Sequence, residues 1–176
     1  MPCCDRSKSR NISGISLYTL LAAVVVLGVL GSTIVTQFTG THSRARAMYD
    51  QAKSLAMAAE RFHLDTGCRP MSVSALFSYQ AARVHSSCNR PVSETQWRGP
   101  YTKKFSMRGD LGARVHEFGP SARVAVDRHY FGRLVVRYEG ATPQISRKAF
   151  EICGGESNDA CGLVSIDNPS TFIYYY

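Results

Sequence analysis

The sequence predicts an α+β protein in which a long N-terminal α-helix packs on a small antiparallel β-sheet. Residues 11–43 contain no Lys, Arg, Asp or Glu, and helical periodicity continues after them to about residue 64. Residues 113–138 alternate apolar and polar side chains between turn sequences, which is typical of strands joined by hairpins. Sequential hairpins form an antiparallel sheet, and one face of that sheet can pack against the helix.

The first half of the predicted helix is long and apolar enough to be a transmembrane segment. Residues 15–38 are mostly apolar, and 24 residues at about 1.5 Å each reach roughly 36 Å, whereas a hydrocarbon core is about 30 Å thick. In lipid the backbone must satisfy its own hydrogen bonds, so the segment is expected to be helical. Three basic residues, Arg6, Lys8 and Arg10, precede residue 11, and two, Arg44 and Arg46, follow residue 43. This difference slightly favours a cytoplasmic N-terminus.

Residues 39–66 are expected to continue this helix as an amphipathic segment. Thr66-Gly67 is a stop signal, and Pro70 follows it, so the helix is predicted over about Ile15–Leu64. The globular head is then expected to comprise residues 67–176. The face that would pack on the head recurs at steps of three and four: Ala45, Met48, Tyr49, Ala52, Leu55, Ala56, Ala59, Phe62 and His63.

The junction before the apolar segment resembles the leader junction of type IV prepilins and pseudopilins. A short basic leader ends at Gly14, and the apolar helix begins at Ile15. In that family a membrane peptidase cuts after the glycine, and the helix anchors the subunit before forming the filament core. The resemblance implies a leader peptide at residues 1–14, cleavage between Gly14 and Ile15, and N-methylation of Ile15.

Thr19 departs from the family pattern at a position that matters for assembly. Most members carry a glutamate there, whose carboxylate neutralises the terminal amine of a neighbouring subunit. Threonine is polar but uncharged, so it lacks this function. Members without the glutamate tend to be minor subunits at the filament tip, and we therefore expect an initiating or tip role for this chain, or a filament with an altered helix register.

A turn around the single tryptophan carries the second resemblance. Trp97-Arg98-Gly99-Pro100-Tyr101 reads as an aromatic anchor on a rigid turn, closing a loop onto the core of the head. It resembles the Trp-x-Gly-Pro-Tyr turn of type IV pilins and pseudopilins. A role for Trp97 in stacking on a ligand is the alternative to core packing.

Four cysteines remain after the predicted leader. An even number on the exported side of a membrane indicates disulfides. Local pairing closes the shortest loops and is preferred among the three connectivities, joining Cys68 to Cys88 and Cys153 to Cys161. The absence of any C-x-x-C pair argues against structural zinc. The Cys153 region also resembles the C-terminal disulfide region of type IVb pilins.

The rest of the head is predicted from turns and alternation. A short helix is expected around Ala75–Ala82, and another between the N-cap Thr142 and Gly154. Strands are expected over the following ranges: Ala113–Phe118, Ala122–Tyr130, Arg133–Tyr138, Leu163–Ile166 and Thr171–Tyr176. The end of the last, Tyr174-Tyr175-Tyr176, is expected to be an edge strand, and an exposed adhesive patch is the alternative.

No catalytic, phosphate-binding or metal-binding motif occurs in the sequence, so we expect neither an enzyme nor a cofactor. The net charge of +8 becomes +6 without the leader, and its bases form no run, which favours a solvated basic surface.

The resemblance implies a structural subunit, major or minor, of a type IV pilus-like filament. Its partners would be other pilin subunits, the prepilin peptidase and an inner-membrane assembly platform. Its location would be the inner membrane with a periplasmic head, then an extracellular pilus or periplasmic pseudopilus. Adhesion, conjugation and secretion all use such subunits. Two alternatives stay open: an uncleaved single-pass inner-membrane protein, and a tip subunit that binds DNA or a cell surface. A conventional signal peptide is disfavoured, because its apolar region would be 7–15 residues long.

Overall fold

The computed structural model describes residues 17–88, 90–105, 107–108, 112–128, 133–164 and 169–176. For Leu17, Thr19 and residues 27–39, 107, 108 and 128, it describes the backbone alone. The predicted leader, residues 1–14, lies outside the described residues. Contacts divide the chain into two units, Met1–Phe38 and Thr39–Tyr176, each of which is described by itself below.

Helix α1 spans Leu17–Thr66, in agreement with the single long helix expected over about Ile15–Leu64. It ends where the sequence placed a stop, because Gly67 adopts a left-handed φ of +70° that a side chain would disfavour. Within the described residues, no helix is both long enough and apolar enough to cross a membrane. This finding does not support the transmembrane part of the fold prediction, which rests on the sequence of residues 15–38.

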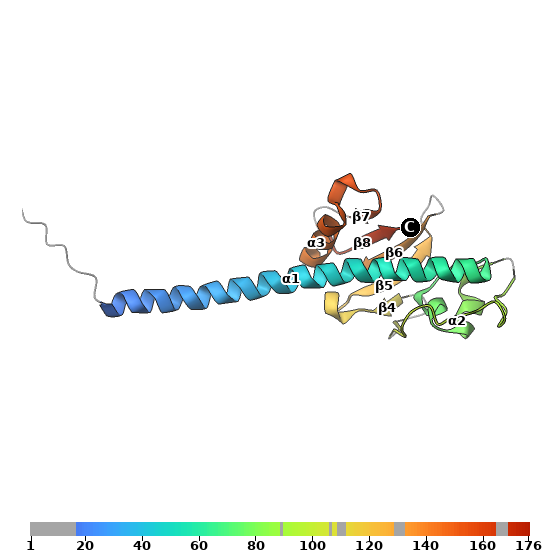
Figure 1. Cartoon of the computed structure of the whole chain (residues 1–176), viewed down its shortest axis with the longest axis horizontal. Helices are drawn as coiled ribbons and strands as arrows, with labels where there is room; N and C mark the ends of the chain where they lie inside the picture. The colour runs from blue at the N-terminus through green and yellow to red at the C-terminus, as the bar shows by residue number, and fades with distance from the viewer. Residues whose placement is uncertain (1–16, 89, 106, 109–111, 129–132, 165–168) are drawn as a thin grey trace, which may run out of the picture. The chain divides into compact units, whose positions relative to one another are not determined.

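The Thr39–Thr66 part of α1 is amphipathic as expected. Its buried face carries most of the predicted residues, and it lies across the sheet in Figure 1. His63 is the exception, since it is exposed and its ring faces the backbone of Cys68. The fully or nearly fully buried positions are Ala45, Met48, Ala52, Leu55, Ala56, Ala58, Ala59 and Phe62.

The main sheet is antiparallel throughout, with the order β3-β4-β5-β6-β8-β7 (Figure 1). Its longest pairing joins β5 and β6 over six residues each. The α+β class and the antiparallel sheet are therefore as predicted. The strands are β3 (Met107–Arg108), β4 (Gly112–Arg114), β5 (Arg123–Arg128), β6 (Leu134–Glu139), β7 (Cys161–Leu163) and β8 (Phe172–Tyr175).

Shorter elements complete the unit. A two-stranded sheet pairs β1 with β2 beside the first disulfide, and α3 lies next to β7 and β8. Their bounds are β1 (Arg69–Pro70), a 3-10 helix η1 (Val73–Leu76), α2 (Tyr79–Val84), β2 (Ser86–Ser87), η2 (His116–Phe118), α3 (Pro143–Cys153) and η3 (Gly155–Ser157).

Four local predictions were wrong. The strand expected over Leu163–Ile166 is β7, which spans Cys161–Leu163 and has ended at Val164. The strand expected over Ala113–Phe118 ends at Arg114, because the chain turns into η2 and buries Phe118 in the core. The helix expected over Ala75–Ala82 is two helices, since Ser78 leaves the helical conformation and caps α2 through its side chain. Strand β8 is not an edge strand: it lies between β6 and β7.

One face of the sheet forms the core with α1 and α3. Tyr138 is fully buried there, and its hydroxyl donates a 2.9 Å hydrogen bond to Oε1 of Gln51 on α1. Tyr49 of α1 meets Tyr174 of β8 edge to face, with ring centroids 6.0 Å apart. The other face of the sheet carries the ion pairs Arg123–Glu139, Arg137–Asp127 and Arg137–Glu139.

Candidate functional site

The residues predicted for processing and assembly are only partly described. Gly14 and Ile15 lie outside the described residues. Thr19 lies in the first turns of α1, where the structure describes its backbone and not its side chain. The predicted cleavage and the role of Thr19 in assembly therefore stay predictions.

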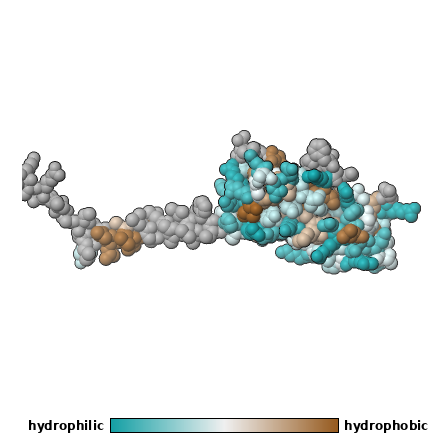
Figure 2. Space-filling view, turned by 45° about the horizontal axis from the view of Figure 1, so that its top comes forward, coloured by the Kyte–Doolittle hydropathy of each residue, from teal (hydrophilic) through white to brown (hydrophobic). Residues whose placement is uncertain are grey.

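The N-terminal part of α1 exposes apolar side chains around the helix. The solvent-exposed fraction is 83% for Tyr18, and five more large or β-branched side chains expose between 55% and 61% of their surface. In Figure 2 this part of the helix is brown, the colour of apolar residues. Helices that are apolar on all sides are normally covered by lipid or protein. The exposed set is Tyr18, Leu20, Leu21, Val24, Val25 and Val26, of which the last five expose 55–61%.

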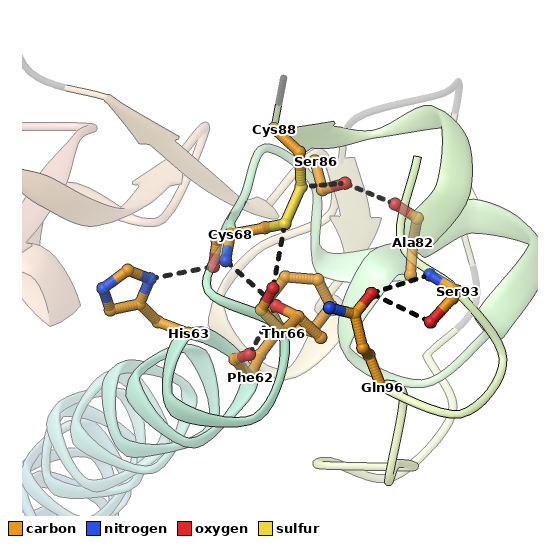
Figure 3. The surroundings of a disulfide bond; sticks show 9 residues. All are labelled: Phe62, His63, Thr66, Cys68, Ala82, Ser86, Cys88, Ser93 and Gln96. Carbon is orange, nitrogen blue, oxygen red and sulfur yellow. Dashed lines mark hydrogen bonds between the residues drawn. A yellow bond between two sulfur atoms is a disulfide. The ribbon is translucent and has the colours of Figure 1, made fainter. Parts of the chain in front are cut away.

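The end of α1 is held by the Cys68–Cys88 disulfide, whose Cα atoms lie 5.1 Å apart (Figure 3). Thr66 bridges the turn: its hydroxyl donates to the Phe62 carbonyl at 2.7 Å and accepts from the Cys68 N–H at 3.1 Å. His63 Nδ1 lies 3.1 Å from the Cys68 carbonyl, so this nitrogen carries the ring proton in that hydrogen bond. The disulfide thus fastens α1 to the loop that returns through α2.

The second disulfide joins Cys153 at the end of α3 to Cys161 in β7, with Cα atoms 6.4 Å apart. Asn158 stabilises the intervening turn, because its Nδ2 donates to the Cys153 carbonyl at 2.6 Å and its Oδ1 accepts from the Ala160 N–H at 3.0 Å. Gly154 closes α3 with a left-handed φ of +119°, as predicted, whereas the predicted cap Thr142 makes no side-chain cap bond. The two bridges form the local pairing that the sequence favoured.

The Trp97–Tyr101 turn packs its aromatic rings at the edge of the core. The Gly99–Pro100 peptide bond is cis, and the Tyr101 N–H donates to the Leu76 carbonyl at 2.7 Å. Position 99 requires glycine, because a Cβ there would lie 2.5 Å from the Trp97 ring. Trp97 is half-buried and packs against the core cluster.

Three aromatic rings form a row at this edge of the core, and the sequence did not predict it. Tyr79 of α2 lies 6.0 Å from Trp97, and Trp97 lies 6.1 Å from Tyr101, measured between ring centroids. The Arg83 guanidinium stands 6.0 Å from the Tyr79 ring, one turn along α2. The i, i+4 spacing of Tyr79 and Arg83 was the available signal.

Burial raises the pKa of several tyrosines in the unit. The pKa of Tyr138 is raised well above its ordinary value, first by burial and then by the charge of Glu117. Burial also raises the pKa of Tyr176, and Arg69 opposes the shift. For Tyr101, burial is the largest cause of a raised pKa, with the neighbouring Asp65 adding to it. These hydroxyls therefore stay neutral over the physiological range.

Across the ranges that the structure describes, no group of three or more His, Cys, Asp or Glu side chains is placed to hold a metal ion. No protein-family model matches the chain, and neither a curated protein nor a solved structure matches it.

Proposed function

We propose that the chain is a structural subunit of a type IV pilus-like filament, processed after Gly14 and assembled through the N-terminal part of α1. The exposed apolar surface of Tyr18–Val26 carries the proposal. It belongs to the same 50-residue helix whose Thr39–Thr66 part supplies the core of the α+β unit.

Exposed apolar surface of this kind drives association. Burying a Leu or Val side chain is worth about 1.5–3 kcal/mol, so the exposed side chains strongly favour any environment that covers them. Lipid covers them before assembly, and the equivalent helices of neighbouring subunits cover them in the filament. Apolar burial is thus exchanged between two environments at little net cost. The membrane stage of this proposal rests on the uncharged sequence of residues 11–43.

The head supports the same proposal through its two disulfides. They close two loops within the Thr39–Tyr176 unit and suit an oxidising compartment, such as the periplasm or the cell exterior. The amphipathic part of α1 is the element on which this unit is built. Partners in assembly would be pilin subunits, the prepilin peptidase and an inner-membrane assembly platform.

Thr19 decides the position that we propose for the subunit. A hydroxyl cannot neutralise the amine of a neighbouring Ile15, so the chain suits a tip or initiating position, where no subunit lies ahead. An uncleaved inner-membrane protein would also cover the exposed apolar side chains, but it would never enter a filament.

Substitution of Thr19 tests this position. In cells that make the chain, the sheared filament fraction is assayed for it, and immunogold labelling locates it along each filament. Thr19→Glu is expected to move label from filament ends to positions along the filament, because the new carboxylate can pair with a neighbouring amine. Thr19→Val is the matched uncharged control and is expected to leave the label unchanged. Unchanged position and yield for Thr19→Glu would contradict the proposed role.

A further inference from the structure

Charges of opposite sign are segregated along the chain. The whole chain carries a net charge of +8, yet residues 149–176 contain four Asp or Glu and no Lys or Arg, which gives −4. Residues 67–105 contain six Lys or Arg and one Asp or Glu, which gives +5. The Thr39–Tyr176 unit therefore has one strongly basic segment and one acidic segment.

The turn between the two cysteines of the second disulfide (residues 154–160) is the acidic turn. Glu156 and Asp159 are exposed on it, and neither forms an ion pair with a described residue. Side chains fix the shape of this turn, because Ser157 and Asn158 both donate hydrogen bonds to carbonyls at the end of α3, each at 2.6 Å. A turn that is already fixed loses little conformational entropy when a partner binds it.

The exposed bases of residues 67–105 form the basic surface. Five of the six bases in this segment are exposed, and none of the five forms an ion pair with a described residue. The Arg83 guanidinium stands 6.0 Å from the Tyr79 ring, which lies 6.0 Å from the ring of Trp97. Arg98 follows Trp97, so α2 and the Trp97 turn present their bases from neighbouring positions. The exposed five are Arg83, Arg90, Arg98, Lys103 and Lys104.

The open face of the sheet differs from these two surfaces in its ion pairs. Its carboxylates are neutralised within the chain, because Glu139 pairs with Arg123 and Arg137, and Asp127 pairs with Arg137. The charges of the acidic turn and of the basic surface have no such ion pairs among the described residues. They are therefore available to another molecule.

The two charged surfaces lie towards opposite ends of the main sheet. The helix η1, which precedes α2, packs beside β4 and β5, whereas η3 of the acidic turn packs beside β7. In Figure 1, α2 and α3 lie on opposite sides of α1. Four strand spacings of about 4.8 Å separate β4 from β7, which is roughly twice the Debye length of about 10 Å at 0.1 M salt. The two surfaces are therefore too far apart to neutralise each other within one copy.

We propose that the acidic turn of one copy docks on the basic surface of a second copy, with Glu156 and Asp159 facing Arg83 and Arg98. Complementary surfaces at opposite ends of one molecule form a heterologous contact, which repeats from copy to copy. Charge complementarity of this kind selects the partner surface and speeds encounter. The contact joins heads and goes beyond the proposed packing of apolar helices, and it depends neither on cleavage after Gly14 nor on Thr19.

Sedimentation velocity of the full chain in a non-ionic detergent measures this contact. The weight-average sedimentation coefficient is expected to rise with protein concentration at about 50 mM salt. At about 500 mM salt it is expected to fall towards the value of the unassociated chain, because salt screens charges that meet at a surface. Association through the apolar helix involves no charged side chain, so the salt-dependent part reports the contact between heads.

Two matched charge reversals test which surfaces meet. Arg83→Glu/Arg98→Glu and Glu156→Lys/Asp159→Lys change the net charge by two units per residue, −4 and +4, so their equimolar mixture has the mean charge of the parent chain. Each variant alone is expected to lose roughly tenfold or more in self-association affinity, because attraction becomes repulsion. The mixture is expected to regain association, since the acidic turn of the first variant can dock on the basic surface of the second.

Arg114→Glu/Arg133→Glu is the matched control for the first variant. It makes the same change in charge at exposed positions outside residues 67–105. We expect this control to associate nearly as the parent chain does. Circular dichroism checks that all three variants are folded.

Three results would overturn the proposal. If the parent chain shows no salt-dependent association, a second copy is not the partner of these surfaces. An equal loss in the Arg114→Glu/Arg133→Glu control would indicate a response to net charge alone. If the mixture of the two reversed variants does not regain association, the two surfaces do not meet. None of these results bears on cleavage after Gly14, so this proposal and the assembly proposal fail separately.

Discussion

The hydroxyls of Tyr138 and Tyr176 are both buried, and they differ in hydrogen bonding. The Tyr138 hydroxyl has a partner in Gln51, 87 residues away along the chain. The Tyr176 hydroxyl is buried without a hydrogen-bond partner among the described residues. A buried polar atom without a partner costs about 1–3 kcal/mol, whereas a satisfied one contributes about 0.5–1.5 kcal/mol. Only the folded structure distinguishes these two tyrosines.

Because of Tyr176, the free energy of unfolding is expected to depend on pH in the alkaline range. Its pKa is raised in the folded protein by burial, so the neutral form is favoured there. The stability contributed by this group is fully present below the unfolded pKa, about 10, and is lost as pH rises from there towards the higher folded pKa. The loss is at most about 1.4 kcal/mol per pH unit.

We therefore expect Tyr176→Phe to be as stable as the parent chain or more stable at pH 7, because it removes a buried hydroxyl that lacks a partner. Between pH 9 and 11 the variant should lose less stability than the parent. Urea unfolding at a series of pH values measures both effects. Parallel pH curves for the two proteins would contradict the burial of this hydroxyl.

At the scale of elements, the patterns of apolar residues predicted the helix and much of the sheet. Helix α1 and strands β5 and β6 follow from apolar periodicities of about 3.6 and two residues, because each element buries one face. The short strands β1, β2 and β3 carry no such pattern. Pairing β1 with β2 depends on the Cys68–Cys88 bridge and on backbone hydrogen bonds, and two-residue strands are too short to alternate.

The surface that carries the aromatic row of Tyr79, Trp97 and Tyr101 was less predictable than the fold. Trp97 and its turn were visible in the sequence, but its neighbour Tyr79 comes from α2, 18 residues earlier. Arg83 reaches the row through helical geometry, and the backbone N–H of Arg98 contacts the Tyr101 hydroxyl within the turn itself. Sequence patterns identify faces of single elements, whereas this surface combines two elements brought together by tertiary packing.

The two disulfides stabilise different elements, and the different lengths of the loops they close predict different contributions to the free energy of unfolding. Their sequence separations are 20 residues for Cys68–Cys88 and 8 residues for Cys153–Cys161. In the chain-entropy model, closing these loops is worth about 3.3 and about 2.5 kcal/mol respectively. We therefore expect Cys68→Ala/Cys88→Ala to lower the free energy of unfolding more than Cys153→Ala/Cys161→Ala does.

Urea unfolding of the two double variants measures this order. A chain in which all four disulfide-bonded cysteines are replaced by Ala serves as the control, since a reductant should destabilise the parent chain and leave this variant unchanged. A larger loss from Cys153→Ala/Cys161→Ala would show that strain or denatured-state structure outweighs loop entropy.

At the scale of the whole molecule, two units have opposite surface character. The Met1–Phe38 unit contains most of the large apolar side chains that stand exposed among the described residues of α1, whereas the Thr39–Tyr176 unit has its own buried core and two disulfides. The exposed apolar side chains of the first unit need to be covered by lipid or protein, whereas the second unit can remain in water. Processing after Gly14 and assembly through the apolar helix would meet both needs in a filament.

The account is tested most directly by determining the N-terminal residue and the intact mass of the chain recovered from cells, with and without reductant. The account predicts an N-methylated Ile15 and a mass increase of four hydrogens on reduction, one pair for each disulfide. Gly14→Leu is expected to block this cleavage, and Ser13→Ala serves as the matched control that retains it. If the unsubstituted chain still carries residues 1–14, processing and assembly are contradicted. The chain would then be a protein anchored by its apolar helix.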